Sequence, residues 1–523
     1  MRGIINLKKT EFVRQIKKDN RQYNIVKFKS YLLMKLSFGE KRKNREFAYS
    51  IYENFHSFDK YSNSLPDGKY YKPTDIVLYD LVKKEDLPTV KKGLIKLFKK
   101  CYCHKYLWGG KAENDIDKLV NGLDQTVNSG KSWYYIGIFD YAYNSTLESY
   151  IDHFTVYFRN FSSSYVAIQV QIVLAKSYAN ELAEFIKKQY KKPGMCVHRH
   201  WGRKKGKSGA KIDYGISSGA QSECAKSQLI YEQLQYVKNI FLNELKKYFP
   251  LMQFSRNRKI YGINVFETNI TFTDNLDPSV YDALGLDERY GFNFSEAERL
   301  YVSTKTLNAF DSYESDMMFL FNPDLFEDYK AYSSAHNKAL CQLTEDYMDK
   351  LYRGVILKDI GIDYLDLISE YRNKVNKNNP NRINHKQLLK LKYDFNKEFY
   401  DLKKIDEELP VDGELDCIDK ILKENFFTSA SIYYGFHTAK VFASNPRWIW
   451  KQIRNNYKEV ENDLNRKLEI ADSLTKFSAE KSNKRMAGAQ LVLAVLTFYL
   501  LIFPDKAMKI ASFLLKIREL LPW

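Results

Sequence analysis

Cys196, His198 and His200 are the residues of this chain whose types and spacing come nearest to a metal site. They alternate within "MCVHRHWG", so on a β-strand their side chains would share one face. Thiolate and imidazole are preferred ligands of Zn²⁺, and a second group could complete a tetrahedral site. That second group is Cys101, Cys103 and His104. Because neither group has the C-x₂-C spacing of known zinc motifs, ordinary placement of Cys and His is the alternative, and the cofactor stays unknown.

A strongly basic segment follows, since residues 191–211 contain Lys and Arg but no acidic residue. Its "GRKKGKS" is one residue too short between Gly202 and Gly206 for a phosphate-binding P-loop. The charge still suits the phosphates of a nucleic acid or a phosphorylated ligand, and an aromatic ring could stack on a base. The predicted contacts are Arg199, Trp201, Arg203, Lys204, Lys205 and Lys207. A solvated basic loop without a ligand is the alternative.

No catalytic motif is present, so the catalytic residues are unknown and the sequence does not decide whether the protein is an enzyme. The chain lacks a nucleophile elbow, an H-E-x-x-H pair and the kinase signature set. Serine, histidine and aspartate are numerous enough to form a triad by chance, which indicates nothing. The elements that would position a site are therefore more informative than the motifs.

Composition indicates a folded, reduced protein with anionic partners. Hydrophobic residues make up 44% and aromatics 15% of 523 residues, which excludes wholesale disorder. The formal net charge of +18 favours nucleic acid, phosphorylated ligands or an anionic membrane surface. Six cysteines are too few for a disulfide framework, and "MRGIINLKKTEFVRQ" has no apolar leader. We expect the body of the protein to lie in the cytoplasm.

The spacing of apolar residues predicts an α+β fold, mostly helical, with a central and mainly antiparallel sheet. Residues 1–130 are expected to form a basic helical region and residues 131–305 an α+β domain that carries the loop 191–211. Strands are expected in "SWYYIGIFDYAY", "DHFTVYFRNF", "SYVAIQVQIVLA" and "RKIYGINVFETNITF". Helices are expected over 87–106, 177–190 and 224–249. Residues 306–447 are expected to be helical.

A long polar helix is predicted over residues 448–484. Its apolar positions lie close to a heptad seam. They are Ile453, Tyr457, Val460, Leu464, Ala471 and Leu474. Lys467 interrupts the seam, with Leu468 beside it. The helix either packs on the protein's own body or forms an oligomeric coiled-coil stalk.

The segment from Met486 to Phe503 contains no charged residue. As a helix it is about 27 Å long, close to the roughly 30 Å of a bilayer's hydrocarbon core. We predict a membrane span, with a buried core helix as the alternative. Gln490 and Thr497 are seven residues apart and share a helix face. With Leu493 and Phe498 they are predicted to line a pore in an oligomer. The alternative is that a single membrane anchor tolerates these two mildly polar residues.

Residues 507–521 are predicted to form an amphipathic helix in the membrane interface, with a short second span as the alternative. The order of long polar helix, span, turn and second apolar helix, over about the last 75 residues, resembles CorA-type magnesium transporters. "FPDKA" stands where that family has its Gly-Met-Asn signature, so the resemblance is one of architecture and does not imply magnesium transport.

These features lead to three functional hypotheses. The first is a membrane-anchored bacterial protein at the inner membrane, with a cytosolic body that binds an anionic ligand. In its concrete form it is a toxic or antiphage-defence effector that forms a homo-oligomer and perturbs the membrane. The second is a nucleic-acid-binding protein or nuclease docked on membrane lipid. The third is a soluble enzyme whose C-terminal helix is buried.

Overall fold

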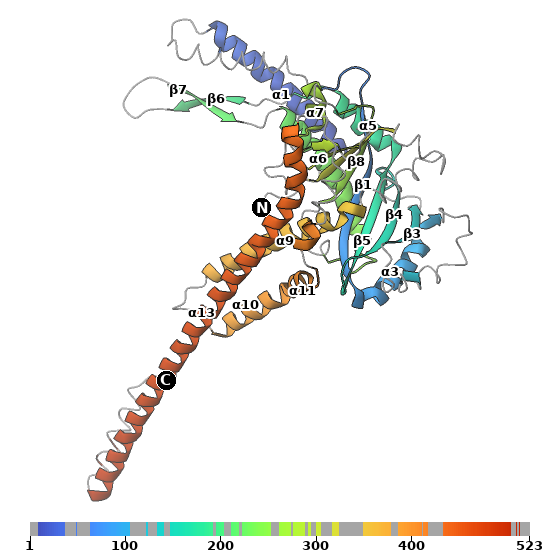
Figure 1. The fold of residues 1–523 in the computed structure, drawn as a ribbon. Coiled ribbons are helices and arrows are strands. Elements are labelled where there is room, and N and C mark those ends of the chain that lie inside the picture. Colours follow the sequence, from blue (N-terminus) through green and yellow to red (C-terminus); the bar gives the residue numbers. More distant parts are fainter. Residues whose placement is uncertain are drawn as a thin grey trace. The chain divides into compact units, whose positions relative to one another are not determined.

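The computed structural model describes most of the central sheet and the long helices (Figure 1). The described residues are 9–36, 49, 63–104, 122–123, 133–140, 147–191, 195–202, 211–218, 222–252, 261–272, 276–287, 291–293, 300–304, 316–323, 349–377, 385–409, 412–416, 432–503, 509 and 512.

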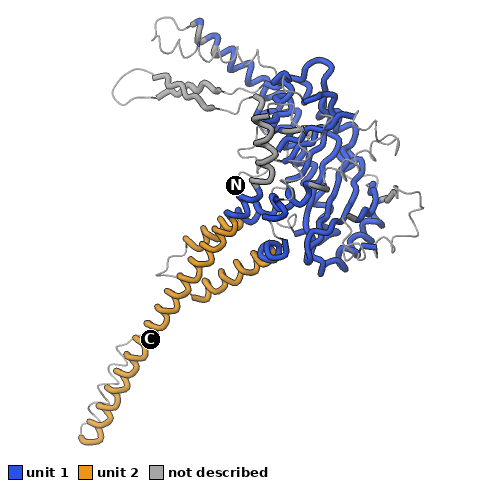
Figure 2. Tube along the Cα trace, viewed as in Figure 1, with its two compact units in different colours: residues 1–365, 402–452 blue, residues 366–401, 453–523 orange. Residues whose placement is uncertain are grey.

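The chain divides into two compact units (Figure 2). The first comprises residues 1–365 and 402–452, and the second comprises residues 366–401 and 453–523. The boundary falls within three helices, each of which contributes to both units: α9 (Asp349–Lys377), α11 (Tyr400–Glu408) and α13 (Ile432–Ile502). The first unit holds the sheet, and the second is helical in its described residues.

The first unit is built on a nine-stranded sheet of order β2-β3-β4-β5-β1-β8-β11-β10-β9. Figure 1 labels its strands β3, β4, β5, β1 and β8. Every pair of neighbouring strands is antiparallel except β8 and β11, which are parallel. The strands are β1 (Tyr71–Lys83), β2 (Tyr102–His104), β3 (Trp133–Asp140), β4 (Ile151–Asn160), β5 (Tyr165–Leu174), β8 (Ile263–Thr268), β9 (Gly291–Asn293), β10 (Leu300–Ser303) and β11 (Met317–Phe321). The predicted α+β fold with a mainly antiparallel sheet is therefore confirmed.

Strands β3, β4, β5 and β8 form where alternating apolar residues predicted them. Strands β1 and β11 instead lie in regions where helices were expected. Strand β1 is buried on both faces, so its sequence "DIVLYDLV" is a nearly continuous apolar run without a period of two. The run "MMFLF" of β11 is buried throughout for the same reason. Periodicity alone does not separate such strands from buried helical segments.

Helices cover the core face of the sheet. The first unit contains α1 (Lys9–Leu36), η1 (Lys84–Asp86), α3 (Leu87–Lys100), α5 (Lys176–Lys187), α6 (Ser222–Leu245) and α7 (Pro278–Leu284). Apolar side chains of α3, α5 and α6 share one continuous core with Ile76, Phe154 and Ile172 of the central strands. The expected helices over 177–190 and 224–249 correspond to α5 and α6. The helix expected over 87–106 ends as α3 at Lys100, and strand β2 follows at Tyr102–His104.

A separate two-stranded antiparallel sheet contains β6 (Met195–Gly202) and β7 (Lys211–Ser218). Its register places His200 opposite Asp213 and Gly202 opposite Lys211. The residues between the two strands lie outside the described ranges.

The second unit is held together by an aromatic cluster. It includes α10 (His385–Glu398) and the start of α11 (Tyr400–Glu408), with parts of α9 and α13. The rings of Phe395 and Tyr457 stack with centroids 4.8 Å apart, and Tyr371 meets Phe395 edge-on at 5.2 Å. The seam positions of α13 from Ile453 to Ala471 are buried, so this part of the helix packs within its own chain.

Candidate functional site

The apolar end of α13 is the most unusual surface of the described residues. The helix is the only one among them that is long and apolar enough to cross a membrane. None of its most apolar window is buried, and Leu501 is 75% exposed. Leu491, Val495 and Phe498 are also exposed, so the apolar surface continues around the helix. The segment is thus not buried as a core helix would be.

The four predicted pore residues all lie on this exposed segment. The Thr497 Oγ1 donates a 2.8 Å hydrogen bond to the Leu493 carbonyl one turn earlier in the same helix. This bond satisfies the hydroxyl without a partner helix. Gln490 is the only amide side chain between Met486 and Phe503, so it is the polar group that an apolar environment disfavours most. Phe498 is 67% exposed.

The predicted phosphate-binding residues belong to β6 and to the residues that connect it to β7. Arg199 lies opposite Tyr214 and Trp201 opposite Ile212 in the strand register. The remaining four, Arg203, Lys204, Lys205 and Lys207, lie outside the described residues. Their role in binding phosphate stays a prediction.

The two predicted zinc-ligand groups belong to different sheets. Cys196, His198 and His200 occupy alternate positions of β6, whereas Cys103 and His104 belong to β2. Burial raises the pKa of the Cys101 thiol to about 11, which keeps it protonated at neutral pH and disfavours metal binding. The described side chains contain no group of three or more His, Cys, Asp or Glu that could hold a metal ion. The β6 group stays a prediction.

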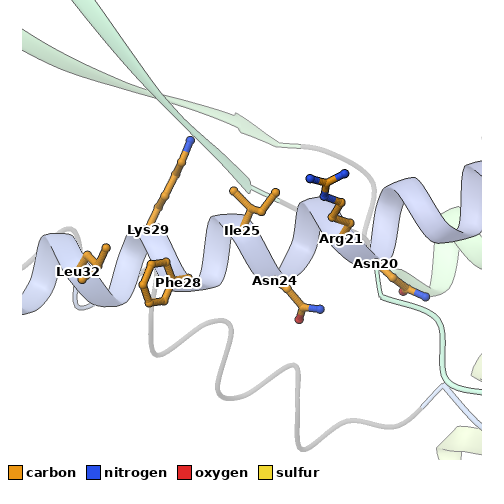
Figure 3. A pocket seen from close by; sticks show the side chains of 7 residues that line it. All are labelled: Asn20, Arg21, Asn24, Ile25, Phe28, Lys29 and Leu32. Carbon is orange, nitrogen blue, oxygen red and sulfur yellow. The ribbon is translucent and has the colours of Figure 1, made fainter.

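A surface groove runs along α1, as Figure 3 shows. Its described lining comes from this one helix and consists of Asn20, Arg21, Asn24, Ile25, Phe28, Lys29 and Leu32. Arg21, Ile25 and Lys29 project from one side of the helix, and Phe28 projects from the other (Figure 3). Because these side chains point in different directions, they do not surround a common ligand.

A buried ion pair in the first unit was missed by sequence reasoning. Lys238 of α6 and Asp316, the residue before β11, are both completely buried, with Nζ and Oδ2 2.6 Å apart. The same Oδ2 accepts hydrogen bonds from the side-chain amides of Gln235 and Asn264, at 3.0 and 3.1 Å. The other oxygen, Oδ1, accepts the Gly262 backbone N–H at 2.9 Å. Four donors thus compensate the buried carboxylate.

Lys358 and Asp359 of α9 extend this group of charges. Burial raises the pKa of Asp359 to about 7, and the nearby Lys358 opposes the shift. Burial likewise lowers the pKa of Lys358, while Asp359 and Asp316 oppose that shift. The Lys358 Nζ also lies 5.3 Å from the centre of the Tyr261 ring. Burial therefore favours the protonated form of Asp359, and the charge of Lys358 opposes this.

One signal in the sequence points to this group. Lys238 stands on the apolar stripe of α6 between Leu234 and Phe241, both of which are buried. A lysine at a core-facing helical position requires a buried partner. The identity of that partner could not be read from the sequence, because Asp316 lies 78 residues further along the chain.

Comparison with family models, with curated proteins and with solved structures finds no match for this chain.

Proposed function

We propose that this chain is a membrane-anchored protein whose body lies in the cytoplasm at the inner membrane. The observation that carries the proposal is the exposed apolar end of α13, of which no part of the most apolar window is buried. Exposed apolar surface costs roughly 25 cal/mol per Å² in water, and soluble monomers rarely leave a large continuous patch uncovered. Lipid would remove this cost along the whole segment.

The flanking residues support insertion. Lys481, Lys484 and Arg485 stand directly before the apolar segment, where they can reach lipid headgroups. Cys101 is a buried, free thiol, which suits a reducing compartment on the side of the body. These features favour a span that begins at the cytoplasmic surface.

Self-association is the second part of the proposal. Ile470, Leu474 and Phe477 form one apolar stripe on α13 before the span, and Phe477 is 65% exposed. Their spacing of four and three residues is that of a coiled-coil seam. A second copy of the chain, held in parallel by the membrane, would cover this stripe. In this form the protein is a homo-oligomeric effector that perturbs the membrane, as expected of a toxin or a defence protein.

The first test is extraction of membranes with carbonate and with detergent, using the full chain and a chain that ends at Ser482. We expect only the full chain to require detergent for release. Val495→Arg places a charge at the centre of the segment, at a cost of about 2.5–3.5 kcal/mol for insertion, and should move the protein to the soluble fraction. Tyr393→Arg is the matched control, because Tyr393 is 66% exposed on α10 outside the span. Equal solubility of the full and shortened chains would refute the anchor.

The effector form is tested separately by membrane potential in cells that express each chain. The full chain should depolarise the membrane, and Gln490→Leu should weaken this effect if the amide lines a pore. Toxicity that survives removal of residues 486–523 would contradict the effector form and leave the anchor intact.

A further inference from the structure

Four polar residues lie together on the sheet face opposite the main apolar core. They are Tyr79 of β1, Tyr157 and Arg159 of β4, and Gln169 of β5. Gln169 lies directly opposite Tyr79 on one side and Tyr157 on the other, so the three side chains share one face. All four residues are at most 1% exposed. We refer to them as the polar sheet face.

The orientation of the Gln169 amide is fixed by Arg159. The Arg159 Nε donates a 2.8 Å hydrogen bond to the Gln169 Oε1. Because a guanidinium group can only donate, this oxygen must be the acceptor and the other end of the amide must be Nε2. That Nε2 is buried and has no hydrogen-bond partner in the described part of the chain. It is therefore a donor that requires an acceptor from elsewhere.

Tyr79 supplies a second donor of the same kind. Its hydroxyl is buried and makes no hydrogen bond with any residue that the structure describes. Burial raises its pKa well above the ordinary value of a tyrosine, with Arg159 opposing the shift, so the hydroxyl keeps its proton. Two neutral donors thus stand beside a buried guanidinium group.

Tyr352 of α9 covers this end of the sheet. The carbon at the centre of the Arg159 guanidinium lies 5.3 Å from the centre of the Tyr352 ring. The Tyr352 hydroxyl donates to the Asn160 carbonyl at 3.0 Å and accepts from the Arg353 Nε at 3.1 Å. Arg353 is in turn bound to both carboxylate oxygens of Glu414, at 2.8 and 2.7 Å. Tyr352 is therefore held in place by hydrogen bonds to Asn160 and to Arg353.

We propose that the polar sheet face binds a small oxyanion, of the phosphate or carboxylate class, between Arg159, the Gln169 amide and the Tyr79 hydroxyl. An oxyanion matches this set because all three groups donate and one of them is positively charged. A cation does not match this set, because a cation needs acceptor groups or negative charge. Asp75, the carboxylate that β1 places on this face, is four residues from Tyr79, about 13 Å away in an extended strand. The inference rests on the proposed function only in assigning the ligand to the body of a membrane-anchored protein.

The probe is inorganic phosphate, added to the full chain in a non-ionic detergent at constant ionic strength. The apparent Tm should rise with phosphate and saturate, whereas chloride should have no such effect. Sodium acetate is the second arm. A response to phosphate alone assigns a phosphate ligand, a response to acetate alone assigns a carboxylate, and a response to both assigns a general oxyanion site.

Two variants keep the fold while removing the site. Gln169→Glu retains an oxygen that accepts a hydrogen bond from Arg159. The new carboxylate neutralises the charge of Arg159, and the Nε2 donor is lost, so the response to phosphate should disappear. Tyr79→Phe removes only the hydroxyl and should weaken phosphate binding about tenfold, the effect of one hydrogen bond. Tyr178→Phe is the matched control, because the Tyr178 hydroxyl is also buried without a partner in the described residues but belongs to α5. It should leave the response unchanged.

The absence of a saturable response to either anion would overturn the inference. A response that is equal in the wild type and in Gln169→Glu would also overturn it, since the anion would then bind elsewhere. Neither result bears on the anchor, because extraction from membranes is measured without added anion and depends on residues of α13.

Discussion

At the scale of single residues, the charges buried in the first unit are compensated by several partners each. Lys226 of α6 donates to the carbonyls of Asn63, Ile186 and Lys188. Two of these carbonyls lie at the end of α5, where a cation is favoured by the helix dipole and by unsatisfied carbonyl groups. Lys226 therefore connects α6 to the end of α5 through its hydrogen bonds.

The titration of Lys226 should make the free energy of unfolding depend on pH. Burial lowers the pKa of Lys226 to about 7, below its value in the unfolded chain. Between about pH 7 and pH 10 the unfolded state binds the proton and the folded state does not, so stability rises with pH over this range. We expect the free energy of unfolding to be about 1–3 kcal/mol higher at pH 9 than at pH 7.

The measurement is urea unfolding at both pH values, for the wild type and for Lys226→Met. The variant lacks the titrating group and should lose this rise. Lys187→Met, at the neighbouring end of α5, serves as the control and should keep it. A rise of the same size in Lys226→Met would assign the pH dependence to other groups.

The buried ion pair of Lys238 and Asp316 should behave differently when one or both partners are removed. Asp316→Ala leaves the ammonium group buried without its counter-charge, which costs about 3–5 kcal/mol. The double variant Lys238→Met with Asp316→Leu removes both charges and should cost less than Asp316→Ala alone. Urea unfolding of the wild type, the single and the double variants checks this order. A double variant that is the least stable of the set would contradict it.

At the scale of elements, the contact that Lys467 makes with α9 accounts for the one polar position in the apolar seam of α13. Its neighbour Leu468 is buried, while the Lys467 Nζ donates to the Val375 carbonyl in the last turn of α9. A lysine near a helix C-terminus satisfies a carbonyl that has no partner within its own helix. The seam of α13 is therefore apolar except where it meets the end of another helix of the second unit.

Removing this contact should weaken the second unit slightly. Lys467→Met keeps the apolar stem but loses the donor, and we expect a loss of about 0.5–1.5 kcal/mol in the free energy of unfolding. Lys476→Met is the control, since Lys476 lies on the exposed part of α13. Chemical denaturation followed by circular dichroism at 222 nm would report both variants, because α9, α10 and α13 are helical. Equal effects of the two substitutions would show that the contact contributes nothing.

At the scale of the whole molecule, the expected behaviour is association within a membrane. Replacing Ile470, Leu474 and Phe477 together by Ser removes the apolar stripe before the span but leaves the span unchanged. We expect this variant to stay in the membrane fraction and to lose cross-linked oligomers, because the seam that a second copy would cover is gone. Chemical cross-linking in membranes, followed by gel electrophoresis, measures this. Unchanged oligomers would place the contact elsewhere.

The sequence by itself determined the features that depend on neighbouring residues. The alternation in β5, the helical stripes of α3 and α5 and the uncharged run after Arg485 were all recognised from local spacing. Local spacing suffices for them because helices and strands present side chains with fixed periods. The predicted fold class and the apolar C-terminal helix followed from these periods.

Only the tertiary structure decided which polar groups become buried. β1 pairs with β5, which follows it by more than 80 residues, and this pairing brings Tyr79 beside Gln169. Asp316 reaches Lys238 in the same way, through the parallel pairing of β11 with β8. No local period encodes such pairings, because the residues that meet are set by the order of strands in the sheet. The apolar segment of α13 could be recognised from sequence, whereas the candidate oxyanion site appeared only once the strands were aligned.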